Sequence, residues 1–172
     1  MRNQRAFTIM ELMITIVVLA ILTTLAVPAF RTFIQNNRLA AQANEMVATF
    51  QLARSEALKR GLTVRVCSSS DGTSCGGDWK EGWIVLADPG GTDQELLRVW
   101  PSPGADFVFT PASGSGWFQS SGCFDHDDSG QCSAPAGNDL LQLDLDRCST
   151  NNIRQLLVTP AGSVATERKE CS

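Results

Sequence analysis

The chain has 172 residues, with 14 basic and 18 acidic side chains and a formal net charge of -4. This negative charge disfavours nucleic-acid binding, because contacts with phosphate depend on positive fields. The sequence also lacks a phosphate-binding loop, a dinucleotide fingerprint and a metalloprotease helix, so it shows no sign of the corresponding enzyme classes.

The first predicted element is an apolar segment at residues 7–30, which only threonines and Glu11 interrupt. About 20 apolar residues are enough for a helix to cross a bilayer. Arg2 and Arg5 precede the segment without an acidic neighbour, so the positive-inside rule places the leader in the cytoplasm and the following chain outside. The alternative is a cleaved secretory signal, but the apolar core of such a signal has only about 7 to 15 residues. We therefore expect a retained single-pass anchor.

Glu11 is the unusual residue of this segment. A carboxylate in a membrane span costs about 2.5 to 3.5 kcal/mol on insertion scales. Buried carboxylates are tolerated when they are paired, so the sequence predicts a partner for Glu11. The alternative is a glutamate side chain that reaches the cytoplasmic headgroups.

The pattern beyond Pro28 remains helical. Apolar residues recur at helical spacings and form one stripe: Leu39, Ala43, Met46, Phe50 and Ala57. Lys59 and Arg60 favour the C-terminal end of a helix, and Gly61 can take the left-handed cap conformation. We expect one helix from Phe7 to Arg60 that Pro28 bends without ending, with its stripe packed on a following sheet.

The periodicity after Gly61 changes to short runs rich in β-branched, aliphatic and aromatic residues, separated by turn residues. These runs predict six to eight strands, with candidates at 63–67, 82–87, 96–100, 107–110, 116–121, 140–145, 154–159 and 163–167. Residues 160–162 predict a hairpin turn. The expected fold class is α+β: a long N-terminal helix packed on an antiparallel β-sheet domain with disulfides. About 110 residues follow the helix, which is enough for one small core.

Six cysteines follow the apolar segment: Cys67, Cys75, Cys123, Cys132, Cys148 and Cys171. An even number in an oxidising compartment favours disulfides. Closeness in sequence favours three pairs: Cys67 with Cys75, Cys123 with Cys132, and Cys148 with Cys171. A zinc site is the weaker alternative, because the chain has no C-x-x-C pair and His126 is its only histidine.

An acidic stretch at residues 125–130 matches the first half of a calcium loop, with candidate oxygen ligands at Asp125, Asp127 and Ser129. The twelfth position is Ala136, where the loop needs a bidentate glutamate. We therefore favour a solvated acidic turn held by the neighbouring cysteines, and we expect no metal and no cofactor.

Residues 72–76 match the letters of the G-x-S-x-G nucleophile elbow. That motif works between a strand and a helix, with a histidine base placed later in the chain. Here it lies in a turn-rich loop that is expected to be disulfide-bonded. We expect no enzymatic activity.

Residues 6–12, Ala-Phe-Thr-Ile-Met-Glu-Leu, resemble the prepilin peptidase site of type IV pilins and pseudopilins, and the match continues to Pro28. The resemblance implies that prepilin peptidase cleaves between Ala6 and Phe7 and that the new Phe7 amino group is methylated. It also implies that Glu11 meets the N-terminal amine of a neighbouring subunit. The departure is Ala6, where the family mostly has glycine, so we expect slower processing.

Two further blocks, residues 43–60 with QLARSEALKR at their end and residues 79–88 with GWIVLAD, resemble the GspH/FimT (FimU) group of minor pilins. This resemblance implies a structural subunit at the tip of a type IV pilus or type II secretion pseudopilus, acting in pilus assembly or protein secretion. The implied partners are other pilins or pseudopilins, prepilin peptidase, the inner-membrane assembly platform and the lipid bilayer.

The implied organisation is a leader at 1–6, a transmembrane helix at 7–30, the periplasmic half of the helix at 31–61, and a GspH/FimT-like β-rich domain at 62–172. The implied location is the bacterial inner membrane, with a cytoplasmic N-terminus and a periplasmic C-terminal domain, and also the pilus or pseudopilus.

The alternative function is a membrane-anchored DNA-binding receptor for natural transformation, because some members of the FimT branch are thought to bind DNA through basic residues near the C-terminus. The basic residues there are Arg147, Arg154, Arg168 and Lys169. Acidic residues offset them: Asp144, Asp146, Glu167 and Glu170. Loss of the two leader arginines would change the formal charge from -4 to -6, so DNA contact is not expected.

Overall fold

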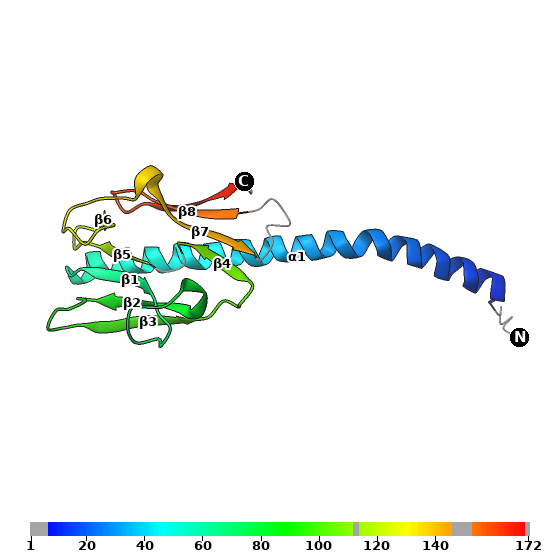
Figure 1. Ribbon diagram of the computed structural model, residues 1–172, viewed down its shortest axis with the longest axis horizontal. Coiled ribbons are helices and arrows are strands. Elements are labelled where there is room, and N and C mark those ends of the chain that lie inside the picture. The colour runs from blue at the N-terminus through cyan, green and yellow to red at the C-terminus, as the bar shows by residue number, and fades with distance from the viewer. Residues whose placement is uncertain (1–6, 112–113, 146–152, 171–172) are drawn as a thin grey trace, which may run out of the picture. The chain divides into compact units, whose positions relative to one another are not determined.

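The computed structural model describes residues 7–111, 114–145 and 153–170. The chain divides into two compact units between Asn37 and Arg38. The first unit holds the N-terminal part of helix α1 (Ile9–Arg60). The second holds the rest of α1 and the strands of the described residues (Figure 1).

Helix α1 confirms the predicted single helix, apart from a start two residues later. It continues through Pro28, where the hydroxyl of Thr32 donates a hydrogen bond to the Pro28 carbonyl oxygen at 3.2 Å. Gly61 has φ +67° and its N–H donates to the Ala57 carbonyl oxygen at 2.9 Å. This glycine therefore provides the predicted left-handed cap.

In the described residues two antiparallel sheets follow the helix, which confirms the expected antiparallel β-sheet domain. The first has the order β3-β2-β1-β5-β6, with β1 (Val64–Ser68), β2 (Gly82–Ala87), β3 (Glu95–Pro101), β5 (Ser115–Phe118) and β6 (Phe124–Asp125). The second has the order β4-β7-β8-β9, with β4 (Phe107–Thr110), β7 (Asp139–Leu145), β8 (Ile153–Val158) and β9 (Val164–Lys169). Short 3-10 turns lie at η1 (Trp79–Glu81) and η2 (Ala136–Asn138). All eight candidate strands are confirmed: 82–87 and 107–110 have the predicted ends, and the other six have an end shifted by one to three residues. The two-residue β6 was not predicted.

The core lies where the second half of α1 meets both sheets (Figure 1). All five residues of the predicted stripe are buried. Phe50 is at its centre, with ring centroids 6.3 Å from both Phe118 and Phe124. The indole N–H of the buried Trp83 donates to the Thr49 hydroxyl oxygen at 3.1 Å, so the polar atom of this large core side chain is satisfied.

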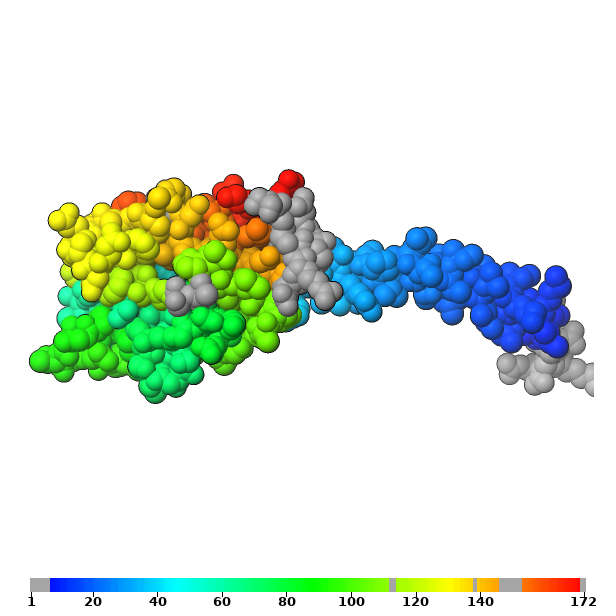
Figure 2. Space-filling model, viewed as in Figure 1, coloured from blue at the N-terminus to red at the C-terminus, as the bar shows by residue number. Residues whose placement is uncertain are grey.

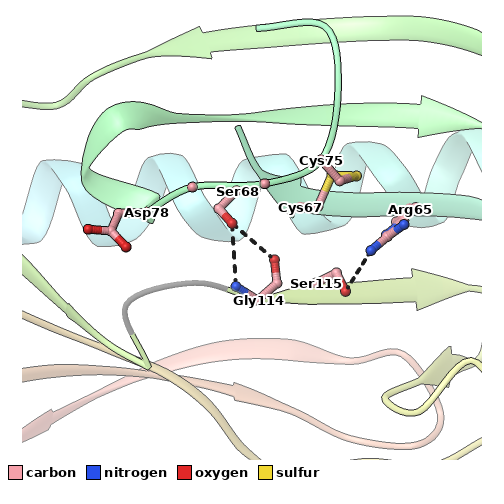
Figure 3. Close-up of a pocket in the computed structure, with 9 residues that line it drawn as sticks. Arg65, Cys67, Ser68, Cys75, Asp78, Gly114 and Ser115 are labelled. Atoms are coloured by element: carbon pink, nitrogen blue, oxygen red, sulfur yellow. Dashed lines mark hydrogen bonds between the residues drawn. A yellow bond between two sulfur atoms is a disulfide. The ribbon is translucent and has the colours of Figure 1, made fainter. Parts of the chain in front are cut away.

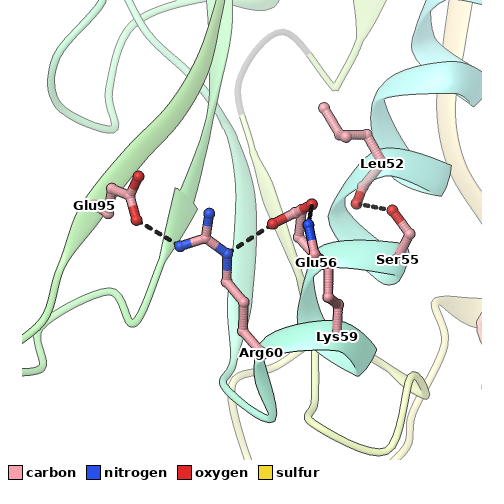
Figure 4. A network of polar contacts seen from close by, with 6 residues as sticks. All are labelled: Leu52, Ser55, Glu56, Lys59, Arg60 and Glu95. Carbon is pink, nitrogen blue, oxygen red and sulfur yellow. Dashed lines mark hydrogen bonds and ion pairs between the residues drawn. The ribbon is translucent and has the colours of Figure 1, made fainter.

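Charged side chains add polar contacts along the same half of the helix. Arg38 pairs with Asp106 through two hydrogen bonds of 2.6 and 3.1 Å. At the end of α1, Arg60 contacts Glu56 at 2.7 Å and Glu95 of β3 at 2.5 Å (Figure 4). The contacts with Asp106 and Glu95 join the helix to segments outside it, whereas the contact with Glu56 lies within the helix.

Two disulfides join neighbouring segments, Cys67 with Cys75 and Cys123 with Cys132. Their Cα atoms are 5.6 and 5.5 Å apart, which suits an unstrained bridge. Both are pairs that sequence separation favoured. Cys148 and Cys171, the third expected pair, lie outside the described residues.

Candidate functional site

The N-terminal unit begins with a capped helix. The N–H of Glu11 donates to the Thr8 hydroxyl oxygen at 3.2 Å, and the N–H of Leu12 donates to the Thr8 carbonyl oxygen at 3.2 Å. The Thr8 hydroxyl therefore satisfies one N–H group of the first turn that has no carbonyl partner in the helix, and the Thr8 carbonyl accepts the first i to i−4 hydrogen bond. Phe7 precedes the helix, and Ala6 lies outside the described residues.

The apolar side chains of this unit are exposed along its whole length. An 18-residue window has mean hydropathy 2.5, and none of it is buried. The hydroxyls of Thr15, Thr23 and Thr24 donate to carbonyl oxygens three residues earlier, at 2.7 to 2.9 Å. By length and composition the helix can cross a membrane, and its threonine hydroxyls are satisfied within the helix.

Glu11 lies in the first turn of α1, where the helix dipole favours a negative charge. Among the described residues, no basic side chain forms an ion pair with its carboxylate. The single chain thus presents one acidic group on an otherwise apolar surface.

Two family models match the chain. One, for the prokaryotic N-terminal methylation motif, covers residues 1–27, and the other, for the type II transport protein GspH, covers residues 42–163. The chain belongs to the GspH family. The predicted membership of this pilin group is therefore confirmed, and GspH-family proteins are subunits that assemble with other pilins in filaments of type IV pili or type II secretion systems.

Solved structures agree with the fold of this GspH-family chain. Two crystal forms of the type IV minor pilin FimU from Pseudomonas aeruginosa (strain PAO1) align with TM-scores of 0.54 and 0.52, both at 20% identity. The alignments cover 78% and 75% of this chain and 92% of the FimU chain in both cases. The likeness confirms the α+β pilin fold. A comparison with curated protein sequences gave no match.

The loop after β6, where calcium ligands were considered, is organised around the Asp125 carboxylate. Asp125 is fully buried and accepts hydrogen bonds from the N–H groups of Asp127 at 3.1 Å and Gly130 at 2.7 Å, and from Gln119 Nε2 at 3.0 Å. The side chains of Asp127 and Ser129 are exposed on the surface of the domain, where Figure 2 shows this loop in yellow. Donors from the protein itself thus occupy the Asp125 oxygens.

The G-x-S-x-G loop of the GspH-family domain has no strand-to-helix geometry. The Ser74 hydroxyl donates to Asp71 Oδ2 at 2.5 Å, and the Thr73 and Ser74 N–H groups donate to Asp71 Oδ1 at 2.8 Å. These hydrogen bonds, led by the one from the Ser74 hydroxyl, hold the pKa of Asp71 well below its usual range. In the described residues His126 makes no contact with Ser74, so the arrangement forms a polar turn and not a nucleophile with its base.

The C-terminal basic residues lie on the last two strands of the domain. Arg154 of β8 pairs in register with Arg168 of β9, and Ile153 pairs with Lys169. Glu167 precedes Arg168 on the same strand and Glu170 follows Lys169. Arg147 lies outside the described residues. The basic group is therefore small and bordered by acidic residues.

Sequence reasoning gave no role to two arginines. Arg54 donates hydrogen bonds from Nε to the Gly122 carbonyl oxygen at 3.0 Å and from Nη2 to the Ala161 carbonyl oxygen at 2.9 Å. Arg65 stacks on Trp117, 4.6 Å from the ring centroid. The period-2 alternation of residues along β1 and β5 could have placed Arg65 and Trp117 on one face of the sheet. The turn that contains Ala161 was predicted, but no local signal indicated that Arg54 contacts it or the turn that contains Gly122.

Aromatic side chains lie on both faces of the first sheet. Trp79 of η1, Trp83 of β2 and Phe118 of β5 are buried in the core. Trp117 points to the opposite face of β5 and is only partly buried.

Proposed function

We propose that this chain is a minor pilin that is inserted into the inner membrane with its N-terminus in the cytoplasm and then joins the tip of a filament. The observation that carries the proposal is the uncovered apolar helix with a single carboxylate, Glu11, in its first turn. A costly charge in the lone subunit becomes favourable when a neighbouring subunit supplies a cation.

Processing would create that cation. Cleavage between Ala6 and Phe7 would place a new amino group four residues before Glu11, and methylation of Phe7 would leave it able to carry a positive charge. The match of residues 1–27 to the N-terminal methylation motif supports this order of events. The peptidase and the inner-membrane assembly platform are the partners that such processing and assembly require.

The filament is proposed to be a type IV pilus, with a type II secretion pseudopilus as the alternative. Both solved structures of similar fold are described as type IV minor pilins, which supports the pilus. The matching family model is described as a type II transport protein, which supports secretion. Deletion of the gene followed by assays of piliation and of protein secretion separates the two.

The decisive experiment combines the mass of the mature N-terminus with incorporation of a Glu11→Gln variant into sheared filaments. We expect a methylated Phe7 terminus, and strongly reduced incorporation of Glu11→Gln. Thr15→Val, which removes a different polar group from the same span, is the matched control and should be incorporated normally. An intact Met1, or equal incorporation of Glu11→Gln and wild type, would refute the proposal.

A DNA receptor remains the alternative function. The acidic residues around Arg154, Arg168 and Lys169 oppose it, because phosphate contacts need a net positive surface. Normal transformation together with loss of filament incorporation in Glu11→Gln would favour a receptor that acts outside the filament.

A further inference from the structure

Arg65 and Trp117 form an unusual pair on the outer face of the first sheet. They are directly opposed in the register of β1 and β5, and the guanidinium carbon lies 4.6 Å from the Trp117 ring centroid. Their neighbours Val64, Val66 and Phe118 point the other way, into the core. Arg65 is therefore held by stacking on the face that the helix does not cover.

The positive charge of Arg65 is poorly compensated within the domain. Its Nη2 donates one long hydrogen bond, 3.3 Å, to the Ser115 hydroxyl oxygen (Figure 3). Its Nε has no exposed surface and no hydrogen-bond partner. Among the described residues, no carboxylate lies within 4.0 Å of its nitrogens. Burial lowers the pKa of Arg65, and the more distant charge of Asp128 partly offsets this.

A pocket of about 370 Å³ opens beside this guanidinium. Arg65, Trp117 and Leu86 of the sheet line it together with Cys75, Pro89 and Asp128 from three separate loops. The loop that carries Cys75 is closed by its disulfide to Cys67, and the loop that carries Asp128 is closed by the Cys123–Cys132 disulfide. Disulfides thus restrain two of the three loops, and restrained pocket walls lose less conformational entropy when a ligand binds.

The surface next to the pocket is apolar. Leu96 and Val99 of β3 expose 40% and 45% of their surface, and Leu96 pairs in register with Leu86, which lines the pocket. An arginine and a tryptophan beside exposed aliphatic residues are typical of protein–protein contact sites. A free small acid would bind in the pocket but would not contact Leu96 and Val99.

We propose that the Arg65 pocket binds the carboxylate of a single aspartate or glutamate side chain that another protein presents with apolar neighbours. A carboxylate can accept two parallel hydrogen bonds from a guanidinium, and the Nη groups would donate them, since Nε is buried. A polyphosphate chain fits less well, because it carries more negative charge than a single carboxylate and Asp128 at the pocket wall and Asp71 in the adjoining loop would repel it more strongly. The proposal does not depend on the filament role.

The test uses the full chain in detergent and three probes: the peptide Ac-Ala-Leu-Glu-Leu-Ala-NH2, its glutamine counterpart, and Ac-Glu-NH2. Binding is followed by tryptophan fluorescence, with a Trp117→Phe variant to assign the signal. We expect the glutamate peptide to bind at least about tenfold more tightly than the glutamine peptide, since charge-assisted bidentate pairs are worth more than neutral hydrogen bonds. The glutamate peptide should also bind more tightly than Ac-Glu-NH2, because its leucines contact the apolar surface beside the pocket. Val99→Ser, which makes that surface more polar, should bring the two affinities together.

Variants of the arginines supply the controls. Arg65→Ala should weaken binding of the glutamate peptide because it removes the charge. Arg65→Lys should also weaken it, because lysine keeps the charge but lacks the planar, forked donors of a guanidinium. Arg98→Ala is the matched control, since Arg98 stacks on Trp100 at 4.8 Å outside the pocket and should leave binding unchanged. Equal binding of the two peptides, or unchanged binding in folded Arg65→Lys, overturns the proposal. If Ac-Glu-NH2 binds as tightly as the glutamate peptide, the ligand is not presented by a protein with apolar neighbours. If inorganic phosphate binds more tightly than the peptide, the ligand is not a carboxylate.

Discussion

The Arg54 guanidinium donates a hydrogen bond to the carbonyl oxygen of Ala161, 2.9 Å away, and so links the helix to the hairpin between β8 and β9. The same side chain donates to the Gly122 carbonyl oxygen in the turn between β5 and β6. These turns belong to different sheets. One helical side chain therefore connects both sheets to α1.

Arg54→Met should lower the free energy of unfolding by about 1.5 to 3 kcal/mol, because two carbonyl oxygens lose a charged donor while the aliphatic stem is kept. Chemical denaturation of the full chain in detergent, followed by tryptophan fluorescence, measures the change. Lys59→Met removes an exposed cation whose one ion pair, to Glu56, is 3.5 Å long, and should change stability by less than about 0.5 kcal/mol. Equal losses in both variants would show that the Arg54 bonds contribute nothing specific.

Gly162→Ala should be more destabilising than Gly130→Ala. The two glycines have nearly the same backbone conformation, with φ +77° and +74°. A Cβ at Gly162 would collide with the Gly122 carbonyl oxygen and lie 3.0 Å from Arg54 Nε, whereas a Cβ at Gly130 meets nothing within 4 Å. Both variants therefore carry a similar cost for placing alanine at a positive φ. The extra loss of unfolding free energy in Gly162→Ala, about 1 to 3 kcal/mol, comes from overpacking. Comparison of the two midpoints in urea measures it, and indistinguishable midpoints would contradict the close approach of the two turns.

Asp125 should make the stability of the domain depend on pH. Burial alone would raise the pKa of this carboxyl, but hydrogen bonds from Gly130, Ser129 and Asp127 outweigh it and hold the pKa below its ordinary value. A carboxyl with a lowered folded pKa stabilises the protein above the unfolded pKa of about 3.9, and this contribution is lost as the pH falls through the folded value. Asp125→Asn should therefore be less stable than wild type at pH 7, and this difference in stability should become smaller below pH 4. Unfolding midpoints of both proteins at several pH values measure this difference. A difference that does not change with pH would contradict the link between Asp125 protonation and stability.

Peptide mapping without reduction should recover the Cys67–Cys75 and Cys123–Cys132 bridges that the structure contains. The pairing of Cys148 with Cys171 is a prediction from sequence separation alone. Replacing Cys123 and Cys132 together by serine should cost about 2 to 4 kcal/mol of stability, because a closed loop restricts the unfolded chain. Any peptide that joins Cys67 to a cysteine other than Cys75 would contradict the fold of the first sheet.

Much of the fold follows from local patterns. The stripe from Leu39 to Ala57 is buried as its spacing predicts, and Gly61 caps the helix. The two-residue strand β6 was missed because it has no period of its own; it exists only through its pairing with β5. The division of the strands into two sheets could not be predicted for the same reason, since a strand sequence does not specify which neighbour it pairs with.

The sequence by itself determined the kind of protein: an apolar helix with Glu11 in its first turn, the residues around Ala6 and Phe7, and the blocks that match the GspH family. These features are local, because helix period, hydropathy and cleavage motifs are properties of contiguous residues. Only the tertiary structure decided that Arg54 connects two sheets, that Asp125 organises its own loop, and that Arg65 stacks on Trp117 beside a pocket. Arg65 meets Trp117 because β1 pairs with β5, and Arg54 contacts Ala161, 107 positions further along the chain, because both sheets pack against the helix. The Asp125 contacts with Asp127 and Gly130 are local, but they form only because the loop after β6 folds back on this carboxylate.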